Sequence, residues 1–103
     1  MNIQESKIER YLTRGVKALG GRCYKWVSPG NTGVPDRIVI LKNAGVIFIE
    51  LKTEHGRPSP MQKTQLKRLK RLGQRATVLY GMADVDEFLA WAEEKESDEH
   101  DRK

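Results

Sequence analysis

The sequence predicts an α/β fold in which a mixed sheet packs against helices, in the chain order αβββαβα. Three observations support this. A helical apolar stripe occupies the first 19 residues, and three segments typical of β-strands follow it. A capped helix then separates these segments from a fourth strand and a last helix. We therefore expect one domain, residues 1–95, followed by a charged, disordered tail, residues 96–103.

The first two elements are a helix over residues 2–19 and a strand over residues 22–28. The apolar residues Ile8, Leu12 and Val16 recur every four residues and Leu19 follows at three, which makes one helical face. Two glycines end this helix. After the strand, residues 29–33 (PGNTG) form a glycine-rich loop that can bring backbone close to a ligand.

The central strands are expected at residues 36–41 and 46–52, joined by a tight hairpin turn. Ser59 then supplies an N-cap and Pro60 a first-turn proline for a helix that reaches Leu72. The fourth strand covers residues 76–81 (ATVLYG). A last helix, about residues 85–94, places its apolar residues on one face.

The charge distribution favours a nucleic-acid partner. The net charge is +5, but residues 93–103 carry −3, so residues 1–92 carry +8. A basic globular body of this size is typical of nucleic-acid binders, although it also serves solubility. No segment has the length and apolarity of a membrane span or the layout of a signal peptide, so we expect a cytoplasmic protein. The single Cys23 predicts neither a disulfide nor a zinc site.

The hairpin turn sets which side chains of the central strands meet. If Asn43, Ala44 and Gly45 form a three-residue loop, Gly45 takes the left-handed position. Asp36 then lies across from Lys52, and Ile38 lies across from Glu50. In this register Asp36 and Glu50 are diagonal neighbours on one face of the sheet, about 7–8 Å apart at their α-carbons.

Two carboxylates at that spacing can bind one small cation. An ionised Glu50 within an apolar strand needs a charge or a metal to offset its desolvation. Mg²⁺ takes oxygen ligands and suits such a pair. Lys52 on the same face can hold a phosphate or polarise a water molecule, although Glu50 and Lys52 on their own would more often be an exposed ion pair.

Further polar residues lie on apolar helix faces. Glu5 falls inside the apolar arc of the first helix and Glu9 lies at its edge, so each is a candidate third acid; a first-turn role for Glu5 is an equal alternative. Gln62 shares the apolar face of the later helix, either near a metal or satisfying backbone groups beside Ser59. Candidate DNA contacts are Lys25, Ser28, Asn31, Arg37, Arg57, Lys63 and Lys67. Trp26 is expected to pack in the core, with stacking on an unpaired base as the alternative.

These motifs resemble a known nuclease pattern. Asp36 after Pro35, followed by Glu50, Leu51 and Lys52, resembles the PD-(D/E)XK nuclease superfamily. More narrowly, KWVSPGNTGVPDRI, FIELK and GRPSPMQ resemble the VRR-NUC family, the virus-type replication-repair nucleases, in its small stand-alone phage and bacterial form. The likeness covers about residues 5–82. It implies a restriction-endonuclease-like fold.

The resemblance also implies roles for individual residues. Asp36, Glu50 and the main-chain carbonyl of Leu51 would bind Mg²⁺ or Mn²⁺, and Lys52 would orient or activate the attacking water. Gln62 would match the family's glutamine. Glu5 would match its first-helix acid, with Glu9 as the alternative.

The expected activity is metal-dependent, structure-selective DNA cleavage. The resemblance implies an endonuclease similar to Holliday junction resolvases, acting as a homodimer on branched DNA in a bacterial or phage-infected cell. A nonspecific DNA nickase is one alternative. A non-catalytic nucleic-acid-binding module on the same fold is another, although such a module would not need Lys52 and both acids.

Overall fold

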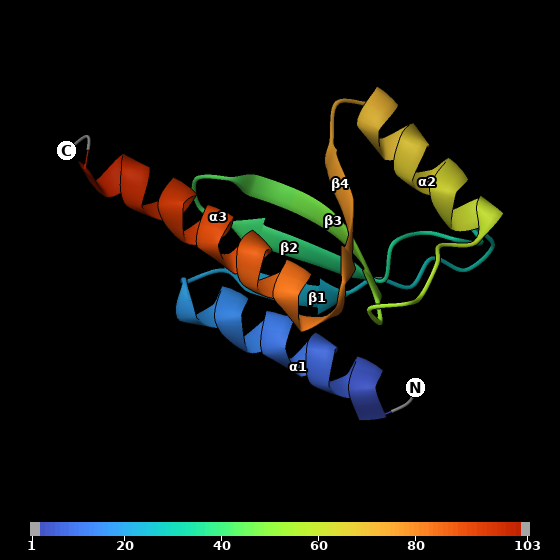
Figure 1. Ribbon diagram of the computed structural model, residues 1–103. Coiled ribbons are helices and arrows are strands. Elements are labelled where there is room, and N and C mark those ends of the chain that lie inside the picture. Colours follow the sequence, from blue (N-terminus) through green and yellow to red (C-terminus); the bar gives the residue numbers. More distant parts are fainter. Residues whose placement is uncertain (1–2, 102–103) are drawn as a thin grey trace.

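The computed structural model describes residues 3–101 of the chain, and the side chains of residues 4–97. Helices and strands follow the predicted order αβββαβα (Figure 1). The elements are α1 (Ile3–Ala18), β1 (Arg22–Lys25), β2 (Arg37–Leu41), β3 (Gly45–Lys52), α2 (Pro60–Arg71), β4 (Arg75–Tyr80) and α3 (Gly81–Asp101). The predicted fold class, a mixed sheet flanked by helices, is therefore confirmed.

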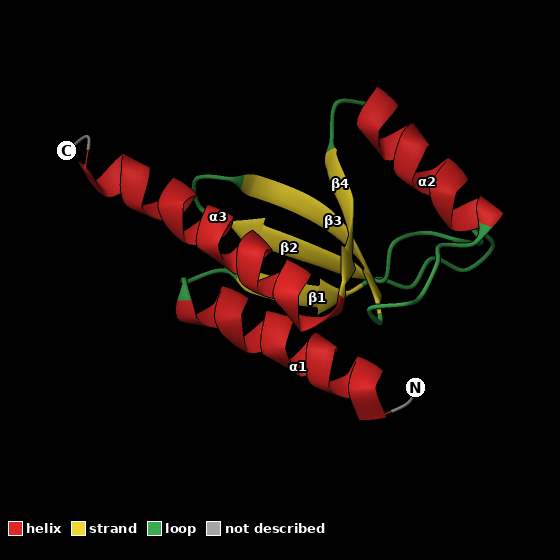
Figure 2. Ribbon diagram, in the orientation of Figure 1, coloured by secondary structure: helices red, strands yellow, loops and turns green. Residues whose placement is uncertain are grey.

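The sheet has the strand order β1-β2-β3-β4 (Figure 2). β1 pairs with β2 and β2 with β3 in antiparallel orientation; the loop of residues 26–36 connects the first pair, and a tight turn after Leu41 connects the second. β4 runs parallel to β3, and α2 is the crossover between them. The sheet is therefore mixed, with β1 and β4 at its edges.

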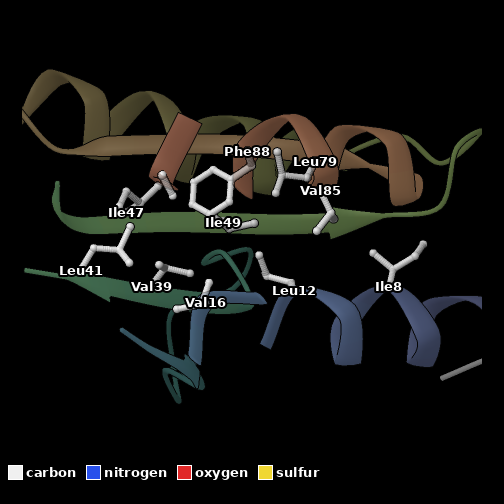
Figure 3. Packing of buried hydrophobic residues seen from close by; sticks show 11 residues of the cluster. Ile8, Leu12, Val16, Val39, Leu41, Ile47, Ile49, Leu79, Val85 and Phe88 are labelled. Carbon is white, nitrogen blue, oxygen red and sulfur yellow. The ribbon is translucent and has the colours of Figure 1, made fainter. Parts of the chain in front are cut away.

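The hydrophobic core lies between one face of the sheet and the pair α1 and α3 (Figure 3). The predicted stripe of the first helix is confirmed, because its central residues are buried and Leu19 packs at the margin. Inward-facing residues of the strands alternate with outward-facing ones, as the period of two requires. The residues between sheet and helices are Ile8, Leu12, Val16, Val39, Leu41, Ile47, Ile49, Leu79, Val85 and Phe88.

The opposite face of the sheet is only partly covered. α2 lies on this side and packs against β4 (Figure 1). Tyr24, Ile40 and Val46, from β1, β2 and β3, retain 53%, 42% and 39% of their accessible surface. An apolar surface on three strands therefore remains open to solvent.

The predicted register of the hairpin was wrong by two residues. Ile38 pairs with Phe48 and Leu41 with Gly45, so Lys42 belongs to the turn instead of facing Val46. The backbone N–H of Lys42 donates to a carboxylate of α3, which takes it out of the β-ladder. Gly45 has the expected left-handed conformation, with φ of 79°. Because the observed register differs from the predicted one by an even number of residues, every side chain of the two strands keeps its predicted face.

α3 is longer than the sequence predicted, running from Gly81 to Asp101 instead of over residues 85–94. The tail expected from residue 96 is helical through Asp101, and residues 102–103 lie outside the described part. The Glu96 carboxylate accepts backbone N–H bonds from Lys42, Asn43 and Ala44 at 3.0, 3.0 and 3.3 Å. The Asn43 amide in turn donates to main-chain carbonyls of α3. Within residues 3–101 no helix is long and apolar enough to cross a membrane.

Replacing Glu96 with alanine should lower the free energy of unfolding by about 1–2 kcal/mol, because three N–H donors of the turn lose a charged acceptor. Urea denaturation followed by circular dichroism would measure the change. Glu94→Ala is the matched control, since Glu94 is an exposed acid of the same helix. Equal stability of the two variants would contradict a structural role for Glu96.

Candidate active site

The two acids of the predicted motif lie side by side where β2 begins and β3 ends. Asp36 immediately precedes β2, and Glu50 is near the end of β3. The observed register brings position 36 opposite position 50, closer than the diagonal placement that the sequence predicted. The Leu51 N–H donates to Oδ1 of Asp36 at 3.3 Å, which ties the two strands together at this point.

Glu50 is buried, and its two carboxylate oxygens have different surroundings. Oε2 accepts a hydrogen bond from the Gln62 amide at 2.9 Å and lies 3.3 Å from the Lys52 ammonium. Oε1 is buried and has no hydrogen-bond partner among the described residues. A buried carboxylate oxygen without a partner costs free energy, so this atom is poised to bind a cation.

Burial raises the pKa of both acids. The pKa of Asp36 rises from 3.8 to about 7, first because the group is buried and second because Glu50 is close, while the Leu51 N–H and Lys52 oppose the rise. Burial also raises the pKa of Glu50, against the effect of Lys52. Two carboxylates held together in a buried site favour protonation unless positive charge is supplied.

The donor set fits a hard divalent cation. Asp36 and Glu50 offer oxygen ligands, and Mg²⁺ is commonly bound by one or two carboxylates with water in its other positions. Among the described residues no group of three or more His, Cys, Asp or Glu side chains is arranged to hold a metal, so water or DNA would complete the coordination. A cavity of about 30 Å³ adjoins the acids, lined by Glu5, Ile8, Glu9, Asp36, Leu51 and Lys52.

Gln62 satisfies backbone groups beside Ser59 and also contacts one of the two acids, while its place near a metal stays a prediction. Its side-chain oxygen accepts from the Ser59 N–H at 2.8 Å, and its own N–H donates to the Ser59 hydroxyl at 3.1 Å, which completes a capping box. Its amide nitrogen donates to Glu50. Residues at the start of α2 therefore fix the orientation of a carboxylate in β3.

Both candidate acids of the first helix, Glu5 and Glu9, line the small cavity. Glu9 also forms an ion pair with Arg37. Arg37 is only 8% exposed, so its prediction as a DNA contact was wrong. The reason is the strand period: Arg37 points to the opposite face from Asp36, toward α1, where Glu9 neutralises it.

Most of the other predicted DNA contacts are exposed and do not line the cavity beside the acids. Lys25, Arg57, Lys63 and Lys67 are exposed. The Asn31 amide donates to the Ser28 hydroxyl at 3.0 Å, so these two residues also stabilise the turn they belong to. Their contact with DNA stays a prediction, as does metal binding by the Leu51 carbonyl.

The glycine-rich loop packs against the start of α2, a role that the sequence did not predict. Gly33 has φ of 87°, and a Cβ atom there would lie 2.6 Å from the carbonyl carbon of Met61 and 2.9 Å from the nitrogen of Gln62. Gln65 donates to the Thr32 carbonyl at 3.1 Å. The sequence predicted a loop whose backbone could approach a ligand closely, but it did not predict that this loop packs on α2.

Gly33→Ala is expected to lower both stability and any cleavage activity, because the new methyl group displaces the first turn of α2 and with it Gln62. Gly30→Ala is the matched control: Gly30 has a similar φ of 81°, but nothing lies within 4 Å of the added carbon. In thermal unfolding, we expect the free energy of unfolding of Gly33→Ala to fall by about 1 kcal/mol or more beyond that of the control. Equal losses would show that the loop does not pack tightly on α2.

Comparisons with known proteins agree with this arrangement. The family model described as the VRR-NUC domain matches residues 4–83. "Putative nuclease p44" of Acyrthosiphon pisum secondary endosymbiont phage 1 is 46% identical over 77 residues, which cover 75% of this chain and 83% of that protein. A solved structure described as a VRR-NUC domain aligns with a TM-score of 0.80 and 29% identity, over 86% of this chain and 97% of that chain. A second, described as a VRR-NUC domain protein, has a TM-score of 0.73 and 20% identity over 92% of each chain, and supports the fold alone.

Proposed function

The chain is a nuclease of the VRR-NUC domain family, and from that premise we propose that it is a metal-dependent, structure-selective DNA endonuclease similar to Holliday junction resolvases. One observation in particular supports dependence on a metal. Glu50 has a buried oxygen without a partner among the described residues, beside a second acid that is partly buried. A cation is the missing charge that would make this arrangement favourable.

In this proposal the acids and the main-chain carbonyl of Leu51 hold Mg²⁺ or Mn²⁺. Such a metal neutralises the charge that develops on a phosphodiester during hydrolysis and makes water a better nucleophile at neutral pH. Gln62 holds one oxygen of Glu50 in place, so that the other oxygen faces the metal. Lys52, 3.3 Å from Glu50, orients the attacking water or the scissile phosphate. Glu5, which lines the same cavity, is the proposed third acid, as the resemblance implies, with Glu9 of the same cavity as the alternative.

The surroundings of the site favour a polyanionic substrate. α2, whose Gln62 contacts Glu50, also carries the exposed Lys63 and Lys67, and Lys25 and Arg57 are exposed on other segments. We infer that the substrate is branched DNA, such as a four-way junction, and that the protein cuts it as a homodimer, which presents two identical sites to the two strands. We place it in the cytoplasm of a bacterial or phage-infected cell.

A cleavage assay tests this proposal. The purified protein is incubated with end-labelled four-way junctions and with linear duplex of the same length, in Mg²⁺, Mn²⁺ or EDTA. Cleavage in either metal and none in EDTA is the expected result. DNA binding that is independent of metal, with no cut strand, would instead support a non-catalytic binding module.

The cleavage pattern separates the two enzymatic alternatives. A resolvase makes symmetric paired cuts near the branch point and spares linear duplex, whereas a nonspecific nickase cuts both substrates at scattered positions. Analytical ultracentrifugation of the same preparation gives the oligomeric state. Scattered nicks from a monomer would exclude the resolvase.

A further inference from the structure

We propose that the open face of β1, β2 and β3 is a stacking surface for unpaired nucleobases, with Tyr24 as the residue on which a base about two nucleotides from the cleavage point stacks. This inference rests on the proposed function, since it specifies the DNA structure that the site would accept. Tyr24 is 53% exposed and lies on the same face of the sheet as Asp36 and Glu50.

The strand pairing places Tyr24 close to the acids. Tyr24 is the direct partner of Ile38, and Asp36 is two residues earlier on the same strand as Ile38. The backbone N–H of Trp26 donates to the Asp36 carbonyl at 2.8 Å, which continues this pairing toward the site. Tyr24 and Asp36 are therefore diagonal neighbours, with α-carbons about 7–8 Å apart. That is about two steps of the 3.4 Å rise between nucleotides in one strand.

Among the aromatic residues of this face, Tyr24 is the one with an open ring. The rings of Trp26 and Phe48 pack on each other with centroids 5.2 Å apart, and both residues are partly buried. These two rings therefore form the base of the surface. Stacking on an unpaired base, which the sequence suggested as an alternative for Trp26, is assigned to Tyr24 instead. Ile40 and Val46, which pair directly with each other, extend the apolar surface away from the acids.

Position and charge favour nucleic acid as the occupant of this face. A DNA strand whose phosphate reaches Asp36 can continue over Tyr24, because the two residues share a face. The exposed cation Arg22 lies two residues before Tyr24 on β1, on the same face, and can contact phosphates. A second copy of the chain, related by a two-fold axis through this face, would present the same cation and add like-charge repulsion. A DNA strand satisfies both the apolar and the cationic parts of the surface.

Equilibrium binding of labelled DNA in EDTA tests the inference without requiring cleavage. The probes are a duplex with a five-nucleotide single-stranded gap and a fully paired duplex of the same length. Tyr24→Ala should weaken binding to the gapped DNA about 5- to 100-fold and binding to the paired duplex less than about 2-fold, since stacking contributes only where a base is unpaired. Tyr24→Phe, which keeps the ring, should bind both probes as the wild type does. Tyr11→Ala is the control, because Tyr11 is exposed on α1 on the other side of the sheet.

Three results would overturn the inference. Unchanged binding of gapped DNA by Tyr24→Ala is one, and an equal loss on both probes is another. The third is a change of sedimenting mass in Tyr24→Ala without a selective loss of gapped-DNA binding, which would assign the face to a second copy. Wild-type protein that binds gapped DNA through Tyr24 yet cuts no DNA with Mg²⁺ or Mn²⁺ would contradict the proposed activity and leave the stacking surface standing.

Discussion

Asp36→Asn and Lys52→Ala should each reduce the rate of DNA cleavage roughly 10³-fold, because the metal and its oriented water contribute several kcal/mol and each 1.36 kcal/mol is tenfold in rate. Asp36→Asn removes an anionic ligand beside Glu50. Lys52→Ala removes the ammonium 3.3 Å from Glu50. DNA affinity should fall only slightly in Asp36→Asn, since phosphate contacts elsewhere on the surface supply most of it.

Single-turnover cleavage and DNA binding, measured on the same protein preparations, check this prediction. Glu54→Gln controls for loss of an acid close to the site in sequence, because Glu54 is exposed. Lys42→Ala controls for loss of a lysine, because Lys42 lies in the hairpin turn at the other end of the strands. Wild-type cleavage rates in Asp36→Asn or Lys52→Ala would remove that residue from the mechanism.

The same Asp36→Asn variant should be more stable than the wild type in the absence of metal at pH 8. In the folded protein the pKa of Asp36 is raised from 3.8 to about 7, so the folded state binds more protons than the unfolded state between these values. The contribution of Asp36 to the free energy of unfolding of the wild type is therefore lost as the pH rises from about 4 to 7. Asparagine avoids this loss, and we expect a gain of roughly 2 kcal/mol at pH 8, less than the full shift would give because the site is partly open to water.

Thermal unfolding in EDTA at a series of pH values would test this. The melting temperatures of the two proteins should agree near pH 4 and diverge up to about pH 7, with the variant higher. Mg²⁺ should then raise the melting temperature of the wild type more than that of Asp36→Asn, because a metal stabilises the folded state by binding the acids. A constant difference between the two proteins at all pH values would mean that Asp36 has an ordinary pKa in the folded protein.

The order of helices and strands and the faces of the central strands were predictable because they depend on local periodicity, although the ends of elements such as α3 were not. The stripe of Ile8, Leu12 and Val16 is buried as predicted, and Ser59 and Pro60 begin α2 as predicted. Asp36 and Glu50 share a face in both the predicted and the observed register, because a shift of two residues preserves strand alternation. The placement of Arg37 followed from the same alternation and was missed.

The tertiary structure decided what depends on contacts between distant segments. The N–H groups of the turn bind Glu96, more than 50 residues away, and this contact accompanies the two-residue change of register. Gly33 meets the start of α2, and Gln62 reaches Glu50, only because α2 crosses back over the sheet. Residue types and strand alternation were enough to predict which residues carry the proposed chemistry and on which face they lie. Their final spacing and the pKa of Asp36 depend on burial and on charges brought together by the fold, which no local pattern encodes.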